Sequence, residues 1–579
     1  MKVQPFLART FLPPQIDLMD PAALAPVFEQ LELRLTGAAD AAALETWLDA
    51  YSEVNAAISE NSARTYIAMT CQTDDPEKEK TYLHLVEKVD PWLKPQQFAL
   101  QQKLVTHPAF DAMPAYYDVF RRSVRNRVSL YREANVPRET EEARLCQQYQ
   151  KIIGAMMVIF DGKEQTLAQL GRVLQETDRA RRQQAWELIA QRRLEDRDKL
   201  EDIFDELLNL RGEIARETGF ADYRAYAFAV NERFDYSPED CVRFQETIEQ
   251  SIVPLARALQ RDRQTKLGVD PLRPWDLAVD PENKPPLQPF ANAEEFVAKS
   301  QTIFNRLDAR LGQSFSLLGA HGLLDLESRK GKAPGGYQST LEESRLPFIF
   351  MNAVGVQGDV VTLLHEAGHA FHALAAREQR LGGYRGSPIE FCEVASMSME
   401  LMAAPHLEEF YSTDDANRAR RQHLEGIIAF FPWMATVDAF QHWLYTHPNH
   451  PRDERRAHWL SLMDRFGGIE EYAGYEDIRG YAWHRQLHIF LHAFYYVEYG
   501  IAQLGALQMW RHARQDPAKA VDLYLNGLSL GGSKPLPELF SAAGLKFDFS
   551  EETIQPLVDD VGAVLAELAS QVDRLVPSR

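Results

Sequence analysis

The sequence is poor in cysteine. Its 579 residues contain four, namely Cys71, Cys146, Cys241 and Cys392. They lie far apart and form no CxxC motif, which excludes a zinc ribbon and a thioredoxin-type redox site. We therefore expect reduced thiols, as is usual in a cytoplasmic protein.

Long hydrophobic segments are also missing. The longest mainly apolar run, 427–437, is interrupted by Pro432 and is too short to cross a bilayer. The first 15 residues contain no sustained apolar stretch and no small-residue cleavage site. These absences predict a soluble, cytoplasmic protein with no membrane partner.

The sequence has fewer basic residues than acidic residues. The chain has 63 Lys and Arg residues against 84 Asp and Glu residues, so its net charge is −21. The resulting pI near 5.3 argues against nucleic acid and against an anionic membrane surface as partners, because both need a basic face. The proportions of 45% hydrophobic and 25% charged residues are ordinary for a globular protein and exclude disorder as the main state.

Most of the chain has the pattern of helices. Apolar residues recur every three or four positions in long segments that are poor in glycine and proline. Six prolines within 267–290 predict a loop between two helical parts. The predicted helices cover 40–72, 94–130, 138–160, 164–218, 358–380, 389–411, 414–446, 451–465, 485–513, 516–527 and 551–575.

One stretch favours strands instead. GKAPGGYQST and LEESRLPFIFMNAVG contain two extended runs around a short polar turn. This pattern predicts a β-hairpin over roughly 336–341 and 346–352. The hairpin directly precedes the residues that carry the chemistry.

Residues 365–369 read His-Glu-Ala-Gly-His, within the helical segment DVVTLLHEAGHAFHALAARE. His365 and His369 are one helical turn apart, so both imidazoles leave the same face and can bind one metal ion. Glu366 flanks that face and can reach a metal-bound water without being a ligand. The motif therefore predicts a catalytic zinc centre in which Glu366 is the general base.

A catalytic zinc ion needs a third protein ligand and one open position. The next helical segment, 388–400, contains Glu390, Glu393 and Glu400 along one stripe. Spacing alone leaves Glu390 and Glu393 as alternatives for the ligand. The remaining acids would orient the zinc-binding histidines.

An aromatic segment follows at 483–510. Its histidines recur every four residues, which places them on one face of a predicted helix, and three tyrosines follow. These residues are His484, His488, His492, Tyr495, Tyr496 and Tyr499. Such a stripe is typical of core packing. Beside a zinc centre, however, its O–H and N–H groups can donate hydrogen bonds to an oxyanion.

Together these motifs resemble the thimet oligopeptidase and oligoendopeptidase F family of zinc metallopeptidases, and the oligoendopeptidase F branch more closely. The resemblance runs from about Gly335 to Tyr499, through PFIFMNAVG, DVVTLLHEAGHAFH, FCEVASMSME and FYYVEY. The later segment GGSKPLPELFSAAGLKF also fits the family pattern. One departure is Ile489–Ala493, where the thimet branch has a mobile, glycine-rich loop.

The resemblance implies a role for each site residue. Glu393 would be the third ligand of one Zn²⁺ per chain, and Glu400 would support a zinc histidine. His488, Tyr496 and Tyr499 would contact the substrate and its oxyanion, with Tyr495 as an alternative in register. Contacts to substrate at the rim of the small sheet would come from Gly335, Gly336 and Tyr337.

The resemblance also implies a mainly α fold, in which two helical lobes flank a deep substrate channel and a small antiparallel β-sheet lies beside the zinc site. Residues 1–200 would form part of the channel wall. Residues 201–579 would form the catalytic region, with the zinc site at 358–400 and the His/Tyr segment at 483–500. The implied activity is zinc-dependent hydrolysis of internal bonds in short, unstructured peptides.

Two other functions stay open at this point. A zinc carboxypeptidase or dipeptidyl carboxypeptidase would need a cation that captures the free carboxylate of its substrate, and Arg345 and Arg485 are candidates. A non-catalytic peptide-binding protein on the same fold would need no general base, so the intact Glu366 argues against it.

Overall fold

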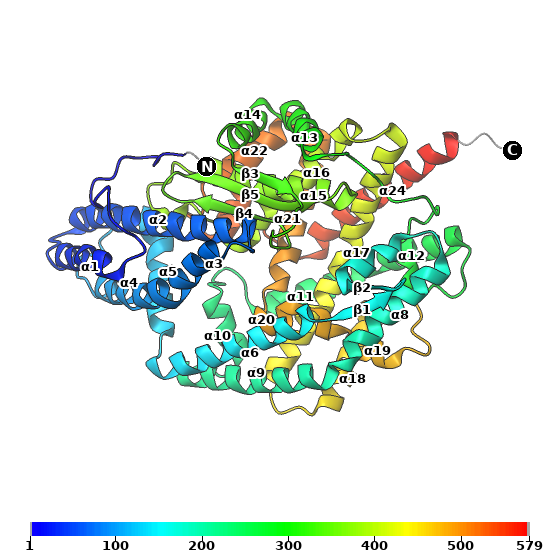
Figure 1. Ribbon diagram of the computed structural model, residues 1–579, viewed down its shortest axis with the longest axis horizontal. Helices are drawn as coiled ribbons and strands as arrows, with labels where there is room; N and C mark the ends of the chain where they lie inside the picture. The colour runs from blue at the N-terminus through cyan, green and yellow to red at the C-terminus, as the bar shows by residue number, and fades with distance from the viewer. Residues whose placement is uncertain (1–2, 576–579) are drawn as a thin grey trace. The chain divides into compact units, whose positions relative to one another are not determined.

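The computed structural model describes residues 3–575, with side chains as far as residue 569 (Figure 1). This part of the chain is mainly α-helical, as predicted, and contains five short strands. It forms two compact units, each built from separate segments of the chain. Within the described residues, unit 1 comprises 3–129, Gln288–Ala416 and Ala502–Phe547, and unit 2 comprises Leu130–Leu287, Asn417–Ile501 and 548–575.

Unit 1 contains a three-stranded sheet and the helices around it. The sheet is formed by β3 (Leu324–Glu327), β4 (Tyr337–Leu341) and β5 (Leu346–Ala353). Its helices are α1 (Pro21–Thr36), α2 (Ala41–Cys71), α3 (Pro76–His84), α4 (Asp90–Val105), α5 (Asp118–Leu130), α13 (Ala293–Leu307), α14 (Ala309–Ala320), α15 (Gln357–Ala376), α16 (Ile389–Ala403), α22 (Pro517–Ser529) and α23 (Leu536–Ala542).

Unit 2 is helical except for one hairpin, β1 (Met157–Phe160) and β2 (Lys163–Thr166). Two long helices, α17 (Thr413–Thr446) and α21 (Tyr496–Gln515), begin in one unit and end in the other. The remaining helices are α6 (Val136–Gly154), α7 (Leu167–Gly171), α8 (Arg179–Glu195), α9 (Arg197–Thr218), α10 (Tyr223–Val230), α11 (Pro238–Thr247), α12 (Val253–Leu267), α18 (Arg452–Phe466), α19 (Glu476–Gly480), α20 (Leu487–Leu491) and α24 (Glu551–Leu575).

The predicted hairpin is confirmed, with β4 and β5 antiparallel and Leu341 paired with Leu346 at the turn. β5 is the central strand, and its residues Pro347–Met351 are all buried. The third strand, β3, pairs with β5 in parallel and was not predicted. Helix α15 follows β5 directly and packs on the sheet (Figure 1). The sheet thereby fixes the start of the helix that carries the HExxH motif.

Four predicted helices are wrong in part. The segment 94–130 is divided into α4 and α5, and the end of 138–160 and the start of 164–218 form the β1–β2 hairpin. Asp161 and Gly162 both have positive φ at that turn, as a two-residue Asp-Gly hairpin requires. The segment 485–513 is divided into α20 and α21, because Phe494 adopts φ 66° between them.

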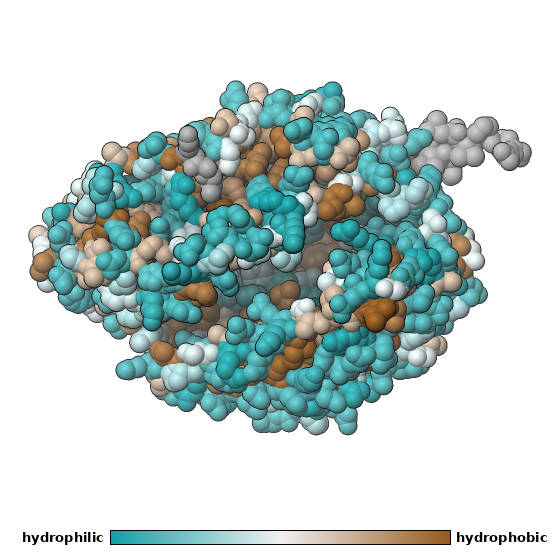
Figure 2. Space-filling view, in the orientation of Figure 1, coloured by the Kyte–Doolittle hydropathy of each residue, from teal (hydrophilic) through white to brown (hydrophobic). Residues whose placement is uncertain are grey.

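The predicted functional division at residue 200 remains a prediction, and residue 200 itself lies inside α9. The lobes flanking a channel likewise remain a prediction of the resemblance. Within the described range, no helix is long and apolar enough to cross a membrane. Figure 2 shows hydrophilic residues over most of the visible surface, in keeping with the net charge of −21.

Candidate active site

Helix α15 presents the two motif histidines side by side in unit 1. Their ring centroids are 4.9 Å apart. The helix is fixed at its start by Asp359, whose Oδ2 accepts the backbone N–H groups of Val354 and Gly355 at 2.8 Å and of Val356 at 3.0 Å. These bonds hold the turn between β5 and α15, so the sheet sets the position of the motif.

Helix α16 brings a carboxylate to the same point. One Oε of Glu393 lies 3.2 Å from Nε2 of His365 and 3.6 Å from Nε2 of His369. One ligand atom from each of the three residues lies within 4.8 Å of the others. Glu390, the alternative that spacing left open, is buried on the same helix and is absent from this group among the described residues.

A close approach of the two helices makes this geometry possible. A Cβ atom on Gly368 would lie 2.6 Å from the carbonyl oxygen of Ala395 and 2.6 Å from Cα of Ser396. Only glycine fits at this contact, because the backbones of α15 and α16 touch there. The glycine inside the HExxH motif is therefore a packing residue for the site.

Glu400, which the resemblance predicts to support a zinc histidine, contacts His365. Nδ1 of His365 lies 2.7 Å from Oε1 of Glu400 and donates to it, and Nε2 is directed to Glu393. Burial disfavours the imidazolium, but hydrogen bonds to Glu393 and Glu400 raise the pKa of His365 above its usual value. Burial lowers the pKa of His369 to about 4.

Glu366 is 7% exposed and follows His365 on α15. Burial raises the pKa of its carboxyl to about 7, although the backbone N–H of Gln338 on β4 donates to it and acts in the opposite direction. A carboxyl group with such a pKa can take up and release a proton near neutral pH. Gln338 was not predicted from the sequence, since a backbone donor leaves no side-chain signal.

The donor set fits a zinc ion. Two imidazole nitrogens and one carboxylate oxygen are common catalytic ligands, and separations of 3.2 and 3.6 Å suit bonds of about 2.0–2.2 Å to one tetrahedral ion. Nδ1 of His365 is already hydrogen-bonded, which leaves Nε2 available as a ligand atom.

A second group of possible ligands lies in unit 2, formed by Cys241, Asp438 and His442. Nδ1 of His442 is 3.5 Å from Nη1 of Arg224, which can only donate, so the ring proton is on Nε2. That nitrogen lies 3.4 Å from Oδ2 of Asp438. A metal ion on Nε2 would force the proton onto Nδ1, against the guanidinium. The arrangement therefore favours a buried Asp–His contact over a metal site.

The predicted His/Tyr residues form one cluster in unit 2. The ring centroid of His488 lies 5.0 Å from that of Tyr496, 5.8 Å from that of Tyr499 and 5.7 Å from that of Tyr495. The break at Phe494 creates the cluster. Its N–H donates to Oε1 of Gln441 at 2.8 Å, and its carbonyl accepts from the buried Arg233.

The prediction of three histidines on one helical face is wrong. His484 lies before α20, in a single 3₁₀ turn (Ala482–Arg485), and its Nε2 is 2.9 Å from a carboxylate oxygen of Glu201. Two residues that were not predicted instead support His488. Nε1 of Trp433 donates to Gln486 at 2.9 Å, and the amide of Gln486 lies 2.7 Å from Nδ1 of His488.

The three residues predicted at the rim of the sheet lie at the start of β4. Gly335 has φ 97°, which favours glycine. The Tyr337 ring stacks on Phe350 with centroids 4.8 Å apart, and its hydroxyl lies 2.6 Å from that of Thr70. Tyr337 is thus tied to α2 and β5. Substrate contact by Gly335, Gly336 and Tyr337 stays a prediction.

Known proteins share both the sequence and the fold. The model of peptidase family M3 matches residues 172–558. The "Oligopeptidase PepF" of Bacillus subtilis (strain 168) is 25% identical over 250 residues, or 41% of this chain and 36% of that protein. The plasmid "Oligoendopeptidase F" of Lactococcus lactis subsp. cremoris is 23% identical over 323 residues, or 53% of this chain and 50% of that protein.

Two solved structures extend the likeness to nearly the whole chain. The structure of "PZ PEPTIDASE A with inhibitor 2" has a TM-score of 0.87 and 30% identity, covering 96% of this chain and 98% of the other. Oligoendopeptidase-F from Enterococcus faecium, at 13% identity, shares the fold with a TM-score of 0.62 over 96% of this chain and 99% of its own. Because the family model spans more than half of the sequence and the fold match nearly all of it, the chain belongs to peptidase family M3, in its oligoendopeptidase F branch, and is a peptide hydrolase.

Proposed function

We propose that this peptidase is a zinc-dependent oligoendopeptidase that hydrolyses internal bonds of short, unstructured peptides. The single observation that carries the proposal is the convergence of His365, His369 and Glu393, whose ligand atoms lie within 4.8 Å of one another. These residues would hold one Zn²⁺. When bound, the ion would supply Lewis-acid polarisation of the scissile carbonyl and a water of lowered pKa.

Glu366 is the proposed general base. Its carboxylate accepts the proton of the attacking water and later delivers it to the leaving amine. Burial suits both steps, because a carboxylate removed from water is a stronger base than an exposed one. The backbone N–H of Gln338 favours the carboxylate form of this group.

His488, Tyr496 and Tyr499 are the proposed substrate-binding residues. Phenol and imidazole donors can stabilise the oxyanion that forms when a peptide carbonyl is attacked. Burial lowers the pKa of His488 to about 4, so the ring is a neutral donor at physiological pH. Burial raises the pKa of Tyr496 to about 12, which keeps its hydroxyl protonated. Tyr495 is the alternative within this cluster.

The test is Glu366→Gln, with Glu378→Gln as the matched control. Glu378 is an exposed glutamate whose recorded partner is Arg377, at 3.7 Å. We expect Glu366→Gln to bind zinc and to lose about 10²–10⁴-fold in kcat on an internally quenched peptide. The control should keep full activity.

Zinc content is measured together with activity, and the products are identified by mass spectrometry. Full activity in Glu366→Gln would exclude the assigned base. Wild-type cleavage that survives complete chelation would exclude a metal-dependent reaction. Products released only from the carboxyl end would favour the carboxypeptidase alternative.

A further inference from the structure

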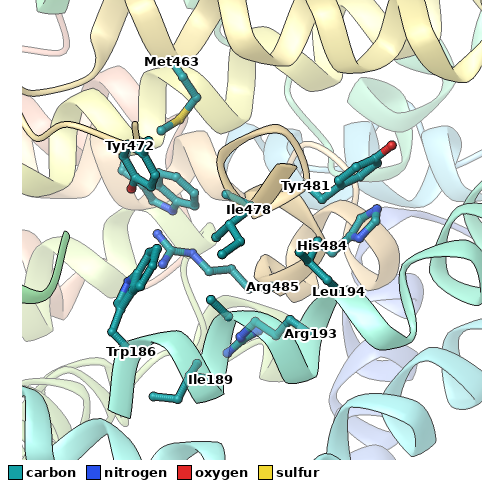
Figure 3. Close-up of a pocket in the computed structure, with 13 residues that line it drawn as sticks. Trp186, Ile189, Arg193, Leu194, Met463, Tyr472, Ile478, Tyr481, His484 and Arg485 are labelled. Carbon is teal, nitrogen blue, oxygen red and sulfur yellow. The ribbon is translucent and has the colours of Figure 1, made fainter. Parts of the chain in front are cut away.

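A pocket in unit 2, separate from the metal-ligand group, is lined by α8, α17, α18 and the segment 472–485 (Figure 3). It contains about 640 Å³ of empty space, including its opening to solvent. Its lining includes two arginines, Arg193 and Arg485, and no aspartate or glutamate. The whole chain has more acidic than basic residues and a net charge of −21, so a pocket lined by two arginines and no acidic residue differs from the rest of the protein.

Within the part of the chain that the structure describes, neither arginine forms an ion pair with an acidic side chain. Arg485 is exposed, and its guanidinium lies 4.5 Å from the ring centroid of Trp433. Arg193 is half-buried on α8, and burial together with the charge of Arg485 lowers its pKa. The charge of Arg485 disfavours the charged form of Arg193, and an anion bound between the two guanidinium groups would offset this repulsion. Guanidinium groups match carboxylates in shape and bind them through paired hydrogen bonds.

The other walls are apolar or aromatic. Trp186, Tyr472 and Ile478 surround the Arg485 side chain (Figure 3). Surfaces of this kind accept the body of a hydrophobic side chain. The pocket therefore suits a carboxylate that is attached to an apolar group, better than it suits a small hydrated anion.

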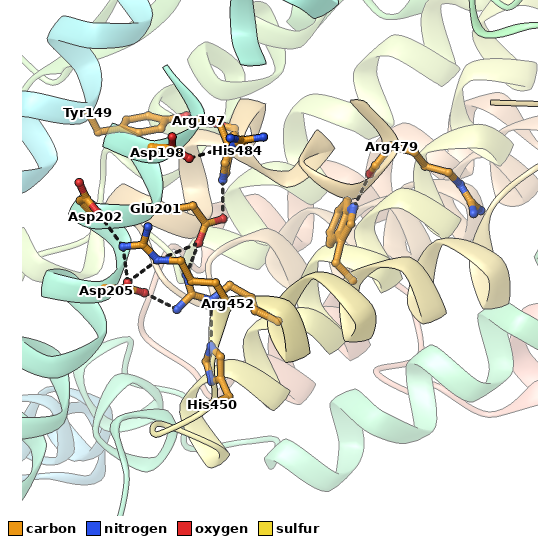
Figure 4. Close-up of polar contacts among 12 residues, drawn as sticks. Tyr149, Arg197, Asp198, Glu201, Asp202, Asp205, His450, Arg452, Arg479 and His484 are labelled. Carbon is orange, nitrogen blue, oxygen red and sulfur yellow. Dashed lines mark hydrogen bonds and ion pairs between the residues drawn. The ribbon is translucent and has the colours of Figure 1, made fainter. Parts of the chain in front are cut away.

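The arginine-bearing segment is held in place by a buried polar network (Figure 4). His484 contacts Glu201 at 2.9 Å, and its carbonyl accepts from the Tyr149 hydroxyl at 2.9 Å. Arg455 donates to Glu201 at 2.6 Å. Arg485 thus follows an anchored residue, and a pre-ordered segment loses less entropy when a ligand binds.

The pocket adjoins the His/Tyr cluster through Trp433. This indole lines the pocket and donates to Gln486, which contacts Nδ1 of His488. The positive charge of Arg485 also acts to lower the pKa of Tyr496. A peptide held by His488 and Tyr496 could therefore extend into the pocket within the same unit.

We propose that this pocket binds the free C-terminal carboxylate of the substrate peptide, with Arg193 and Arg485 at the carboxylate and the aromatic walls around the last side chain. The inference rests on the proposed function, because it assumes that His488 and Tyr496 contact the peptide. It assigns a substrate class: peptides with a free, apolar C-terminal residue, cut at an internal bond.

The test compares two internally quenched peptides that are identical except for a C-terminal carboxylate or carboxamide. We expect wild-type kcat/KM to be at least about tenfold higher for the acid. In Arg193→Gln and Arg485→Gln, the acid-to-amide ratio should fall towards one. Arg485→Lys should keep part of the ratio, because it retains the charge and loses the paired geometry.

Arg144→Gln is the matched control, since Arg144 is an exposed arginine in the same unit whose recorded carboxylate contact is Glu141, three residues away. It should leave the acid-to-amide ratio unchanged. A wild-type ratio near one would overturn the inference, as would a ratio that persists in both glutamine variants. Cleavage of neither peptide would instead mean that the proposed function fails.

A binding measurement separates the possible sources of the anion. Quenching of tryptophan fluorescence is titrated with N-acetylphenylalanine, with its amide and with inorganic phosphate. The inference predicts saturable quenching by the acid alone, lost in Arg485→Gln. Equal binding of phosphate and the acid would overturn it in favour of a general anion site.

Discussion

His365 and His369 share one face of α15, but their electrostatic surroundings differ. The ring of His365 lies between Glu393, at 3.2 Å, and Glu400, at 2.7 Å. These carboxylates raise its pKa against the effect of burial, whereas burial lowers the pKa of His369 to about 4. In the metal-free protein, His365 therefore carries a proton at neutral pH, and a metal ion must displace it.

This proton predicts how zinc affinity depends on pH. A histidine with the ordinary pKa of about 6.5 is already neutral above pH ~7.5, so zinc affinity would be flat there. Because the pKa of His365 is raised, the affinity should instead continue to rise, by about tenfold per pH unit, between pH ~7 and ~8.5. Competition with a chromophoric chelator measures the slope. Calorimetry in two buffers should show about one proton released per zinc ion at pH ~8, and release near zero would contradict the assignment.

Glu400 should control both zinc affinity and this proton. Glu400→Gln keeps an oxygen that can accept from Nδ1 of His365 but removes the negative charge. We expect zinc affinity to fall by about 10–100-fold. Proton release should also decrease, because the pKa of His365 is no longer raised from this side. Chelator competition on Glu400→Gln and on the Glu378→Gln control measures both effects, and equal affinities would exclude the supporting role.

At the level of single residues, the sequence predicts what a local pattern encodes. The spacing of His365 and His369 specifies a shared helical face, and the resemblance chooses Glu393 over Glu390. Gln338, Trp433 and Gln486 have no such pattern. Gln338 acts through its backbone N–H, and the other two reach His488 only because α17 packs beside the segment before α20.

At the level of elements, the contact between α15 and α16 determines whether the three ligands meet. Gly368→Ala would place a methyl group 2.6 Å from backbone atoms of α16, which cannot move as a side chain can. The gain of about 1 kcal/mol in helix propensity should be exceeded by the strain of overpacking. We expect a net loss of about 1–3 kcal/mol in the free energy of unfolding, together with weaker zinc binding, as measured by urea denaturation and chelator competition.

Gly358→Ala provides the control on the same helix. A Cβ atom there meets nothing within 4 Å, so the variant should be as stable as wild type or slightly more stable. Zinc affinity should be unchanged. If Gly368→Ala behaved like Gly358→Ala in both measurements, the close helix contact would not be what positions Glu393.

The elements that the sequence predicts are those whose partners are near in the chain. The β4–β5 hairpin is local, and its alternation and turn are visible. β3 is a four-residue strand that pairs in parallel with β5, and β4 lies between the two in sequence, so no local signal marks it. The helix break at Phe494 is also hidden, because Gln441 and Arg233, which are distant in sequence, hold the unusual backbone.

At the level of the whole molecule, residues 3–129 belong to the unit that contains the metal-ligand group. Glu60 on α2 accepts the backbone N–H of Ser344 in the hairpin turn at 2.6 Å. Tyr384, 2% exposed, belongs to the core formed by α1, α2 and α4, and its hydroxyl donates to the carbonyl of Tyr116 at 2.8 Å. The N-terminal helices thus provide part of the core around the site.

This organisation predicts that residues 201–579 do not fold alone, although they contain every candidate site residue. Removing residues 1–200 would expose the core around Leu381 and Tyr384 and leave Ser344 without its carboxylate. We expect the fragment to lack cooperative urea unfolding and to bind zinc much more weakly than the full chain.

Co-expression of 1–200 with 201–579 is the control and should restore zinc binding. If the fragment alone unfolded cooperatively and bound zinc as tightly as the full chain, the predicted functional boundary at 200 would also be a folding boundary, and the N-terminal helices would be dispensable for the site.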